Sequence, residues 1–393
     1  MLCEQALCTG CRACENKCPT RALTMKEDGE GFLRPFLDTS RCTQCGLCRS
    51  TCPVLNTPAQ APSQREPGTY ACWSLDETIR ERSSSGGVFS LLAKEVLKDG
   101  GVVFGASFDE DLRVRHTYIE DFEQIDGLRR SKYVQSDTGD CYLQVENFLK
   151  AGRPVLFVGA PCQVAGLNAY LGKPYENLLT LSFICYGVPS PKVFETYIRY
   201  REDKHKARAA RLSFREKQGS GWSNCAMCIE FEDGTKLRHP LKQDPYFVGF
   251  GRHLFTRPSC FECHFRYPNI FSDMTLGDFW GADKLEGLKA NDDKGVSLVL
   301  THTPKGEEGL KRIAPHLFIQ RRSFEEALKY NPRLKTSSAC PRNRSRFFEE
   351  FAQDTDFERL IRRYMTNTGW KAGLKKTIKA LLGEGLIHKL RRG

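Results

Sequence analysis

Eight cysteines near the N-terminus form two copies of one motif. Both copies have the spacing C-x2-C-x2-C-x3-C-P: Cys8, Cys11, Cys14 and Cys18-Pro19, then Cys42, Cys45, Cys48 and Cys52-Pro53. In loops with this spacing, three neighbouring thiolates hold a [4Fe–4S] cluster and the fourth cysteine ligates the other cluster. The predicted ligands are therefore Cys8, Cys11, Cys14 and Cys52 for one cluster, and Cys42, Cys45, Cys48 and Cys18 for the other.

Zinc is the main alternative for such cysteines. Zinc ligands usually come as two pairs with a longer spacer, whereas four cysteines fall between positions 8 and 18. The 18 cysteines follow a start without a secretory pattern, and cytosolic thiols stay reduced, so metal ligation explains them better than disulfides do. We expect a cytoplasmic protein with a bacterial-type ferredoxin module that relays electrons. Cys3 lies outside both motifs and is interpreted as a bystander.

The composition indicates a water-soluble chain of more than one domain. Its 393 residues exceed one ordinary core. The mean hydropathy is −0.46, and no apolar run approaches the roughly 20 residues of a membrane-spanning helix. The formal charge of +11 is compatible with nucleic acid, an anionic membrane surface or acidic ligands. Many basic residues lie in 371–382 and 389–392, where we expect a solvated helix, with membrane or partner docking as the alternative.

The residues after the cysteine motifs predict a linker followed by an α/β domain. Residues 57–68 are rich in Pro, Ala, Gln and Gly, as is typical of linkers. Beyond them, apolar strand-like runs at 101–105, 154–159, 178–184 and 296–300 alternate with helical patterns such as 88–97 and 191–201. From about residue 211 to 238 the apolar period changes to two, which predicts an inserted antiparallel hairpin. The fold class is thus α/β with a mixed sheet, preceded by a small α+β ferredoxin domain.

Two segments of the α/β region are typical of ligand-binding turns. Ser83-Ser84-Ser85-Gly86-Gly87 precedes an amphipathic helix, and free backbone N–H groups at such a helix start suit a phosphate. A plain serine cap is the alternative. Gly159-Ala160-Pro161-Cys162-Gln163 directly follows a buried strand, and ligands collect at the carboxyl ends of strands in open α/β sheets.

At this point the sequence resembles the coenzyme F(420) hydrogenase and dehydrogenase beta-subunit family. The matching segments are, in order, Ser84-Ser85-Gly86-Gly87-Val88, Ser131-Lys132-Tyr133-Val134-Gln135-Ser136, Gly159-Ala160-Pro161-Cys162-Gln163, Cys185-Tyr186-Gly187-Val188-Pro189-Ser190, Arg257-Pro258-Ser259-Cys260-Phe261-Glu262-Cys263 and Thr275-Leu276-Gly277-Asp278-Phe279-Trp280-Gly281. The resemblance implies bound FAD, a further [4Fe–4S] cluster and a two-electron substrate. Together with the cysteine spacing, the linker composition and the charge of the C-terminal segment, it divides the chain into a ferredoxin domain (1–56), a linker (57–68), two parts of one catalytic domain (69–150 and 151–335) and a basic helical tail (336–393).

The resemblance further implies residues for FAD. Ser85, Gly86 and Gly87 would contact its pyrophosphate, Lys132 would neutralise phosphate or polarise the flavin, and Gly159, Ala160, Pro161 and Gln163 would line its pocket. An exposed surface lysine is the alternative for Lys132. Arg130 stands where the family has glycine. No catalytic residue is predicted.

For the third cluster, the predicted ligands are Cys162, Cys185, Cys260 and Cys263. Cys260 and Cys263 have C-x2-C spacing, whereas Cys162 and Cys185 each follow an apolar strand, and neighbouring parallel strands would bring them together. Cys225 and Cys228 are also C-x2-C but lie in a strand pattern, where they would face opposite sides. We interpret them as bystanders, and Cys72, Cys141 and Cys340 as small buried residues. Asp278 is a candidate cluster neighbour or a turn residue, and the aromatic residues at 247–255 are candidates for flavin contact or core packing.

These observations favour an FAD-dependent oxidoreductase, because a flavin connects one-electron clusters to two-electron chemistry. Coenzyme F(420) or another small molecule would be the substrate, and ferredoxin or a deazaflavin coenzyme would be the redox partner. The alternative is a non-catalytic electron-relay subunit of a larger redox complex. Nucleic-acid binding rests on charge alone and is not expected. Membrane contact would be at most peripheral, through the basic tail.

Overall fold

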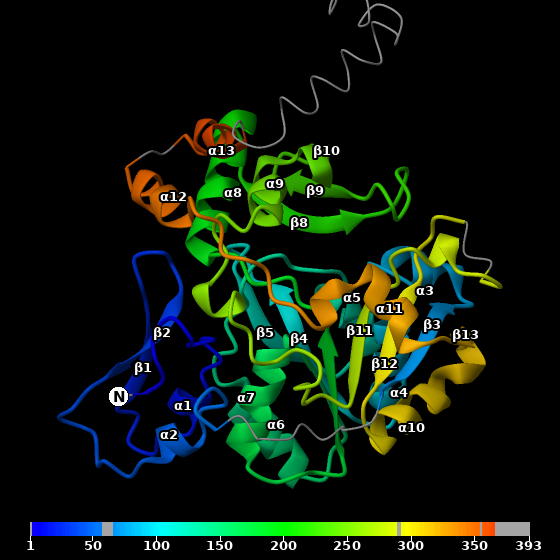
Figure 1. Ribbon diagram of the computed structural model, residues 1–393, viewed down its shortest axis with the longest axis horizontal. Helices are drawn as coiled ribbons and strands as arrows, with labels where there is room; N and C mark the ends of the chain where they lie inside the picture. The colour runs from blue at the N-terminus through cyan, green and yellow to red at the C-terminus, as the bar shows by residue number, and fades with distance from the viewer. Residues whose placement is uncertain (1, 57–65, 289–291, 354–355, 366–393) are drawn as a thin grey trace, which may run out of the picture.

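The computed structural model describes residues 2–56, 66–288, 292–353 and 356–365 (Figure 1). Three parts are visible: a small cysteine-rich domain at the N-terminus, an eight-stranded sheet with helices on its faces, and a three-stranded antiparallel sheet above it. Most of the expected linker and the basic runs at 371–382 and 389–392 lie outside the described residues. None of the described helices combines the length and the apolar composition that crossing a membrane requires.

The N-terminal domain consists of two short helices and one hairpin. Its elements are α1 (Ala13–Asn16), β1 (Leu23–Glu27), β2 (Leu33–Leu37) and α2 (Leu47–Ser50). β1 and β2 are antiparallel, with Leu23 opposite Leu37. Each helix begins after a residue of positive φ, Arg12 or Gly46, so each cysteine loop turns sharply before its helix. This small domain thus combines helices and strands.

The large sheet is mixed and has the strand order β13-β3-β12-β11-β7-β6-β4-β5. Its strands are β3 (Gly68–Ser74), β4 (Val102–Phe108), β5 (Val114–Ile119), β6 (Val155–Gly159), β7 (Leu178–Phe183), β11 (Met274–Asp278), β12 (Ser297–Thr301) and β13 (Leu317–Arg321). The central neighbours β4, β6, β7 and β11 run parallel, and the remaining pairs are antiparallel. The predicted mixed α/β sheet is confirmed.

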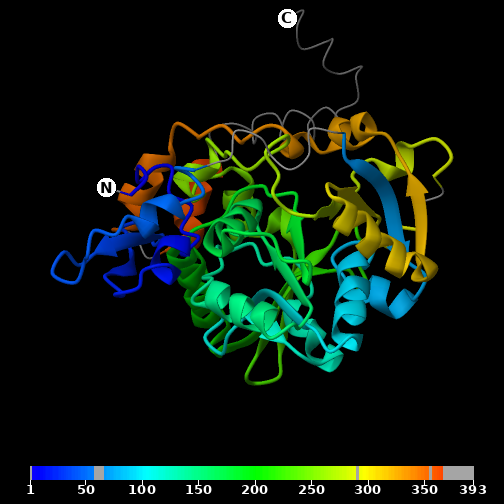
Figure 2. The same ribbon diagram turned by 90° about the horizontal axis from the view of Figure 1, so that it is seen from below.

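Helices cover both faces of this sheet because its strands are apolar on both sides. One face packs on α4 (Val88–Lys98) and α10 (Pro304–Ile313), which cover Val103 and Leu156 among others. The opposite face meets α6 (Cys141–Lys150), α7 (Pro161–Leu171) and α11 (Phe324–Tyr330). Fully burying each large apolar side chain contributes roughly 1.5–3 kcal/mol. Figure 2 shows the cysteine-rich domain at one end of the molecule, with β3 and β13 at the other.

The inserted unit is a three-stranded sheet rather than the single hairpin predicted. It comprises β8 (Ala209–Glu216), β9 (Ala226–Phe231) and β10 (Lys236–Pro240), in the order β10-β9-β8. β8 has two register shifts against β9, and such bulges interrupt the period-two pattern that marks a strand in a sequence. Four helices pack on this sheet in one apolar cluster: α8 (Pro191–His205), α9 (Pro245–Gly251), α12 (Arg344–Phe351) and α13 (Phe357–Met365). The beginning of the segment assigned to a basic tail is therefore part of a core.

Candidate iron–sulfur centres and cofactor site

The N-terminal cysteines gather into two groups, each built from both motifs. In the first group, burial and the neighbouring thiols of Cys11, Cys8 and Cys52 raise the pKa of Cys14. In the second, burial and the thiols of Cys18 and Cys45 raise the pKa of Cys48. The last cysteine of each motif thus lies at the other motif's group.

Backbone N–H groups donate to the sulfurs in both groups. Cys8 and Cys11 of the first group accept bonds from Gly10 and Ala13. In the second, Ala22 N donates to Cys18 Sγ over 3.3 Å, and Gln44 N donates to Cys42 Sγ over 3.4 Å. Such donors stabilise negative charge on sulfur, as an iron–sulfur cluster requires.

Cys3 also lies at the first group. Its thiol lies within hydrogen-bond reach of both Cys52 and Cys8, and this contact raises the pKa of Cys3 and lowers that of Cys8 to about 5. Its position outside the repeat gave no indication of this contact, because the two residues that it meets are brought together only by the fold.

A third group forms in the main domain from Cys162, Cys185, Cys260 and Cys263. Burial, and then the thiols of Cys263, Cys185 and Cys260, raise the pKa of Cys162 well above its usual value. Cys162 lies in the first turn of α7, directly after β6, and Cys185 follows the parallel neighbour β7. The two parallel strands therefore bring these cysteines to one edge of the sheet, as the sequence predicts.

The other two thiols of this group lie on the turn after Pro258. Val188 N donates to Cys260 Sγ and Gly187 N donates to Cys185 Sγ, each over 3.4 Å. No three His, Cys, Asp or Glu side chains in the described part of the chain are arranged to hold a single metal ion. The donors in each group are thiols, the soft ligands that iron–sulfur clusters use. The chemistry of the donor set and the N–H groups around it thus fit a cluster.

The first and third groups lie next to each other across the boundary between the domains. Cys11 packs on Gly166 of α7, where an added Cβ would lie only 3.0 Å from Cys11 Sγ. Cys162 is one helical turn earlier on α7, so it shares this face of the helix. Cys11 is also one of the thiols that raise the pKa of Cys162. The first and third cysteine groups are therefore direct neighbours in the fold.

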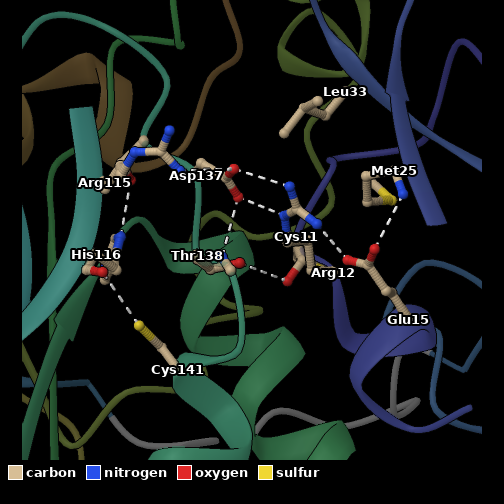
Figure 3. A network of polar contacts seen from close by, with 12 residues as sticks. Cys11, Arg12, Glu15, Met25, Leu33, Arg115, His116, Asp137, Thr138 and Cys141 are labelled. Carbon is tan, nitrogen blue, oxygen red and sulfur yellow. Dashed lines mark hydrogen bonds and ion pairs between the residues drawn. The ribbon is translucent and has the colours of Figure 1, made fainter. Parts of the chain in front are cut away.

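Charged and polar contacts fix the cysteine-rich domain to the main domain (Figure 3). Arg12 Nη2 donates to Asp137 Oδ2 over 2.8 Å, and Arg12 Nη1 pairs with Glu15. Thr138 Oγ1 donates to the Cys11 carbonyl oxygen over 3.1 Å, which connects this ion-pair network to the first cysteine group.

A second cluster of polar residues surrounds the Ser84-Ser85-Gly86-Gly87 turn. Ser131 N donates to Ser84 Oγ over 2.9 Å, and Lys217 Nζ donates to the Ser85 carbonyl oxygen over 3.1 Å. Lys217 lies beside Arg215, and burial and neighbouring arginines lower its pKa to about 8. The turn, the loop at 130–133 and the end of β8 therefore form one basic region.

The two glycines of this turn have different roles. A Cβ on Gly86 would lie 2.3 Å from the Cys72 carbonyl oxygen. The Gly86 N–H donates to Ser297 Oγ over 2.9 Å. Gly86 thus permits close packing on the sheet. Gly87 caps α4 at φ 95° without a side-chain cap bond. Among the described residues, no acceptor faces the N–H groups of Gly87, Val88 and Phe89, so these remain available to an anion.

Arg215 is the residue that sequence reasoning missed in this region. Its side chain is buried and pairs with Asp278, yet its Nε and Nη2 have no hydrogen-bond partner in the described part of the chain. Asp278 also accepts a bond from Trp222 Nε1 over 2.9 Å, and the Trp222 ring stacks on Trp280 at 4.8 Å between centroids. Asp278 therefore belongs to this basic region, where it contacts Arg215 and Trp222. Buried guanidinium N–H groups without an acceptor indicate a missing polar partner.

Lys132 and Arg130 adjoin this region from the same loop. Lys132 Nζ donates to the carbonyl oxygens of Gly127 and Arg129, each over 2.7 Å, and burial lowers its pKa to about 7. Arg130 has φ 67°, the left-handed conformation that glycine adopts most easily. Its guanidinium pairs with Glu216, so side-chain contacts hold the backbone in this conformation.

The Gly159–Gln163 turn lies at the third cysteine group. Gln163 Oε1 accepts a bond from Ala160 N over 2.9 Å, and Gln163 Nε2 donates to Ser136 Oγ over 3.0 Å. These two bonds position the first turn of α7, which carries Cys162 and begins with Pro161.

The remaining cysteines lie elsewhere. Cys228 lies in β9, and Cys225 directly precedes this strand. Cys72 and Cys141 are buried as expected. Cys340 is exposed, so its interpretation as a buried residue was wrong; the segment between α11 and α12 leaves it at the surface. Among the aromatic candidates, Phe250 and Phe255 are core residues.

The fold and the cysteine groups define an iron–sulfur protein with a mixed α/β domain. The chain matches the coenzyme F(420) hydrogenase/dehydrogenase beta subunit, with the N-terminal part at residues 69–140 and the C-terminal part at 152–327. Residues 7–56 match a 4Fe-4S dicluster domain. The chain therefore belongs to the coenzyme F(420) hydrogenase/dehydrogenase beta-subunit family, an oxidoreductase-type family.

Solved structures that resemble this chain are also known. No curated protein matches the chain. A chain of the F(420)-reducing [NiFe] hydrogenase complex from Methanosarcina barkeri, in a xenon-derivatised structure, is 16% identical, with a TM-score of 0.46. The match covers 69% of this chain and 91% of the other.

Proposed function

We propose that this protein is an FAD-dependent iron–sulfur oxidoreductase. Three [4Fe–4S] clusters exchange electrons with FAD, which reduces or oxidises coenzyme F(420) or another small two-electron substrate. The observation that carries the proposal is the gathering of Cys162, Cys185, Cys260 and Cys263 beside Cys11. A relay to a separate protein would need only the N-terminal groups, whereas a third group inside the main domain extends the path toward a bound cofactor.

The basic region around Ser85 supports the placement of FAD. The free N–H groups at the start of α4 suit its pyrophosphate, and the unpaired Nε and Nη2 of Arg215 suit a ring oxygen or nitrogen. Lys217 and Lys132 have pKa values lowered by burial to about 8 and about 7. An anionic ligand would favour their protonated forms and so bind more tightly.

Each part of the chain has a separate task in this mechanism. The cysteine groups hold clusters, and the contact between Cys11 and α7 keeps the first and third close together. FAD, when bound, would exchange single electrons with the clusters and an electron pair with the substrate. Trp222 and Trp280 stack on each other beside the Arg215–Asp278 pair, where Trp222 donates to Asp278 and the Arg215 guanidinium lies over the Trp280 ring. A ferredoxin or a deazaflavin coenzyme is the proposed redox partner.

An anaerobic preparation tests the proposal. We expect about twelve iron atoms per chain, as three clusters require, together with one FAD. About eight iron atoms without flavin would instead support a non-catalytic relay subunit of a larger redox complex. Zinc in place of iron would contradict both.

The third cluster is tested by Cys260→Ser. We expect this variant to lose about four iron atoms and one set of electron paramagnetic resonance (EPR) signals, because three thiolates hold a cubane poorly. Cys228→Ser is the matched control, since Cys228 belongs to the other C-x2-C pair and lies in β9. Full iron content and unchanged signals in Cys260→Ser would disprove the ligand assignment.

A further inference from the structure

Two buried arginines have no carboxylate partner among the residues that the structure describes. Six arginines of the described residues are buried: Arg80, Arg129, Arg215, Arg257, Arg266 and Arg344. Four of them pair with Asp292, Asp126, Asp278 and Glu30, respectively. Within the described part of the chain, Arg257 and Arg266 have no carboxylate at ion-pair distance. Arginine does not lose its proton in proteins, and a buried charge is costly unless it is paired.

Arg257 extends from the main domain into the cysteine-rich domain and is 0% exposed. Its Nε donates to the Cys8 carbonyl oxygen over 2.8 Å, its Nη1 to Gln135 Oε1 over 2.9 Å, and its Nη2 to the Leu33 carbonyl oxygen over 2.9 Å. These acceptors are all neutral. Arg257 Nη2 also lies 3.8 Å from Cys8 Sγ. The guanidinium is therefore buried against the first cysteine group.

The first cysteine loop is shaped to admit this side chain. Gly10 has φ 71°, and a Cβ there would lie 2.8 Å from Arg257 Nη1. The backbone of Arg257 meanwhile accepts a bond from Cys260 N over 3.0 Å. Arg257 thus stands between the first group and the third.

Arg266 has the corresponding position at the third group. Its Nη1 donates to the Cys185 carbonyl oxygen over 3.1 Å, and its Nε donates to Ser337 Oγ over 3.3 Å. Burial raises the pKa of Cys185, and the positive charge of Arg266 opposes that rise. Both carboxylate-free arginines therefore lie against cysteine groups.

We propose that Arg257 and Arg266 are the countercharges of two [4Fe–4S] clusters, those of the first and third cysteine groups. A cluster bound by four thiolates is an anion, and one-electron reduction adds a further negative charge. A buried cation nearby stabilises the reduced form more than the oxidised form, so it raises the reduction potential. Arg257 also makes docking of the two domains depend on the first cluster. The role of Arg266 rests on the proposed third cluster, whereas that of Arg257 requires only the N-terminal dicluster domain.

The test is an EPR-monitored redox titration of the anaerobic holoprotein. Arg257→Gln should lower the potential of one N-terminal cluster, with roughly a tenfold loss in the equilibrium constant for its reduction, or about 59 mV. Arg266→Gln should lower a different potential, that of the signal missing in Cys260→Ser. Arg344→Gln is the matched control, because Arg344 is also buried between the domains but is already neutralised by Glu30.

Arg257→Lys keeps the charge and should retain most of the wild-type potential, which also covers the case in which Arg257→Gln fails to fold. Unchanged potentials in Arg257→Gln at full iron content would overturn the proposal, as would an equal shift in Arg344→Gln. If the third cluster does not exist, Cys260→Ser removes no signal and Arg266→Gln shifts none. The proposed function then fails, while the result for Arg257 still stands or falls independently.

Discussion

The Arg215–Asp278 pair joins two elements that are far apart in the sequence. Arg215 is on β8 of the inserted sheet, and Asp278 ends β11 of the large sheet. Asp278 satisfies Nη1 of the guanidinium, and Nε and Nη2 remain free in the described structure. The pair therefore neutralises the charge and leaves two N–H donors for a ligand.

Replacing Arg215 by Gln should weaken FAD binding by roughly ten- to a hundredfold, since a hydrogen bond to a charged group contributes about 1.5–3 kcal/mol. Fluorescence titration of the flavin-depleted protein with FAD would measure the change. Asp278→Asn is the matched control, because it breaks the same ion pair but keeps the free donors of Arg215. Equal losses in the two variants would show that the ion pair, rather than those donors, matters for binding.

At the level of single residues, the sequence predicts cysteines better than arginines. The repeated spacing predicts both N-terminal groups, and the order of strands and cysteines predicts the third. Arg257 and Arg266 have no comparable signal, because arginine is common on surfaces and each acts through partners far away in the chain. The contact of Arg257 with Cys8, for example, joins residues 249 positions apart.

Helix α7 lies between the first and third cysteine groups, and the face that meets Cys11 carries a small residue, Gly166. Gly166 lets Cys11 and the Tyr142 hydroxyl approach closely, since an added Cβ would lie 3.0 Å and 2.9 Å from them. Tyr142 donates to the Gln163 carbonyl oxygen over 2.8 Å. A tight approach of the two domains therefore depends on the absence of one side chain.

We expect Gly166→Ala to slow electron transfer from the N-terminal clusters to the third cluster several-fold, because the added methyl group separates α7 from Cys11. Ala is intrinsically better than Gly in a helix by about 1 kcal/mol, so a loss would come from this contact. Flash-induced reduction, followed by the absorbance of the clusters, would measure the rate. Gly251→Ala in α9 is the control, because a Cβ added there would have no neighbouring atom within 4 Å. An unchanged rate at full iron content would contradict this account of the interface.

Among the larger elements, those with a regular pattern are predictable. The sequence indicates α4, α8 and the buried strands β4, β6, β7 and β12, whose apolar runs reflect burial on both faces. It predicts a single hairpin where β8, β9 and β10 form three strands, because register shifts interrupt the alternation of β8. It also gives no sign that α12 and α13 belong to the core of the inserted sheet. Their apolar residues face an element that lies more than a hundred positions earlier.

The N-terminal domain has too small an apolar core to be stable without its clusters. Besides cysteines, its described residues include five buried apolar side chains: Ala13, Ala22, Leu23, Phe32 and Pro53. Domains of this size usually need metal or disulfides for stability. Its contacts with the main domain include the Arg12–Asp137 and Arg344–Glu30 pairs.

Removal of iron by a chelator should therefore unfold the N-terminal domain and leave the large sheet folded. Without clusters, Arg257 loses its countercharge and the thiols lose their ligand, whereas the apolar layers around β6 and β7 are unaffected. Hydrogen exchange read out for β1 and β2 should rise to nearly unprotected rates, and β6 and β7 serve as internal controls. Retained protection of β1 and β2 in the iron-free protein would show that the domain is stable without metal.

The three cysteine groups differ in their access to solvent. Cys45 of the second group is exposed and Cys42 is partly exposed, whereas Cys11 and Cys52 of the first are buried. A diffusing electron carrier would meet the second group first, and so would dioxygen. Air damage to this protein would then begin at its outer cluster, disconnecting the enzyme from its donor while the inner centres are still intact.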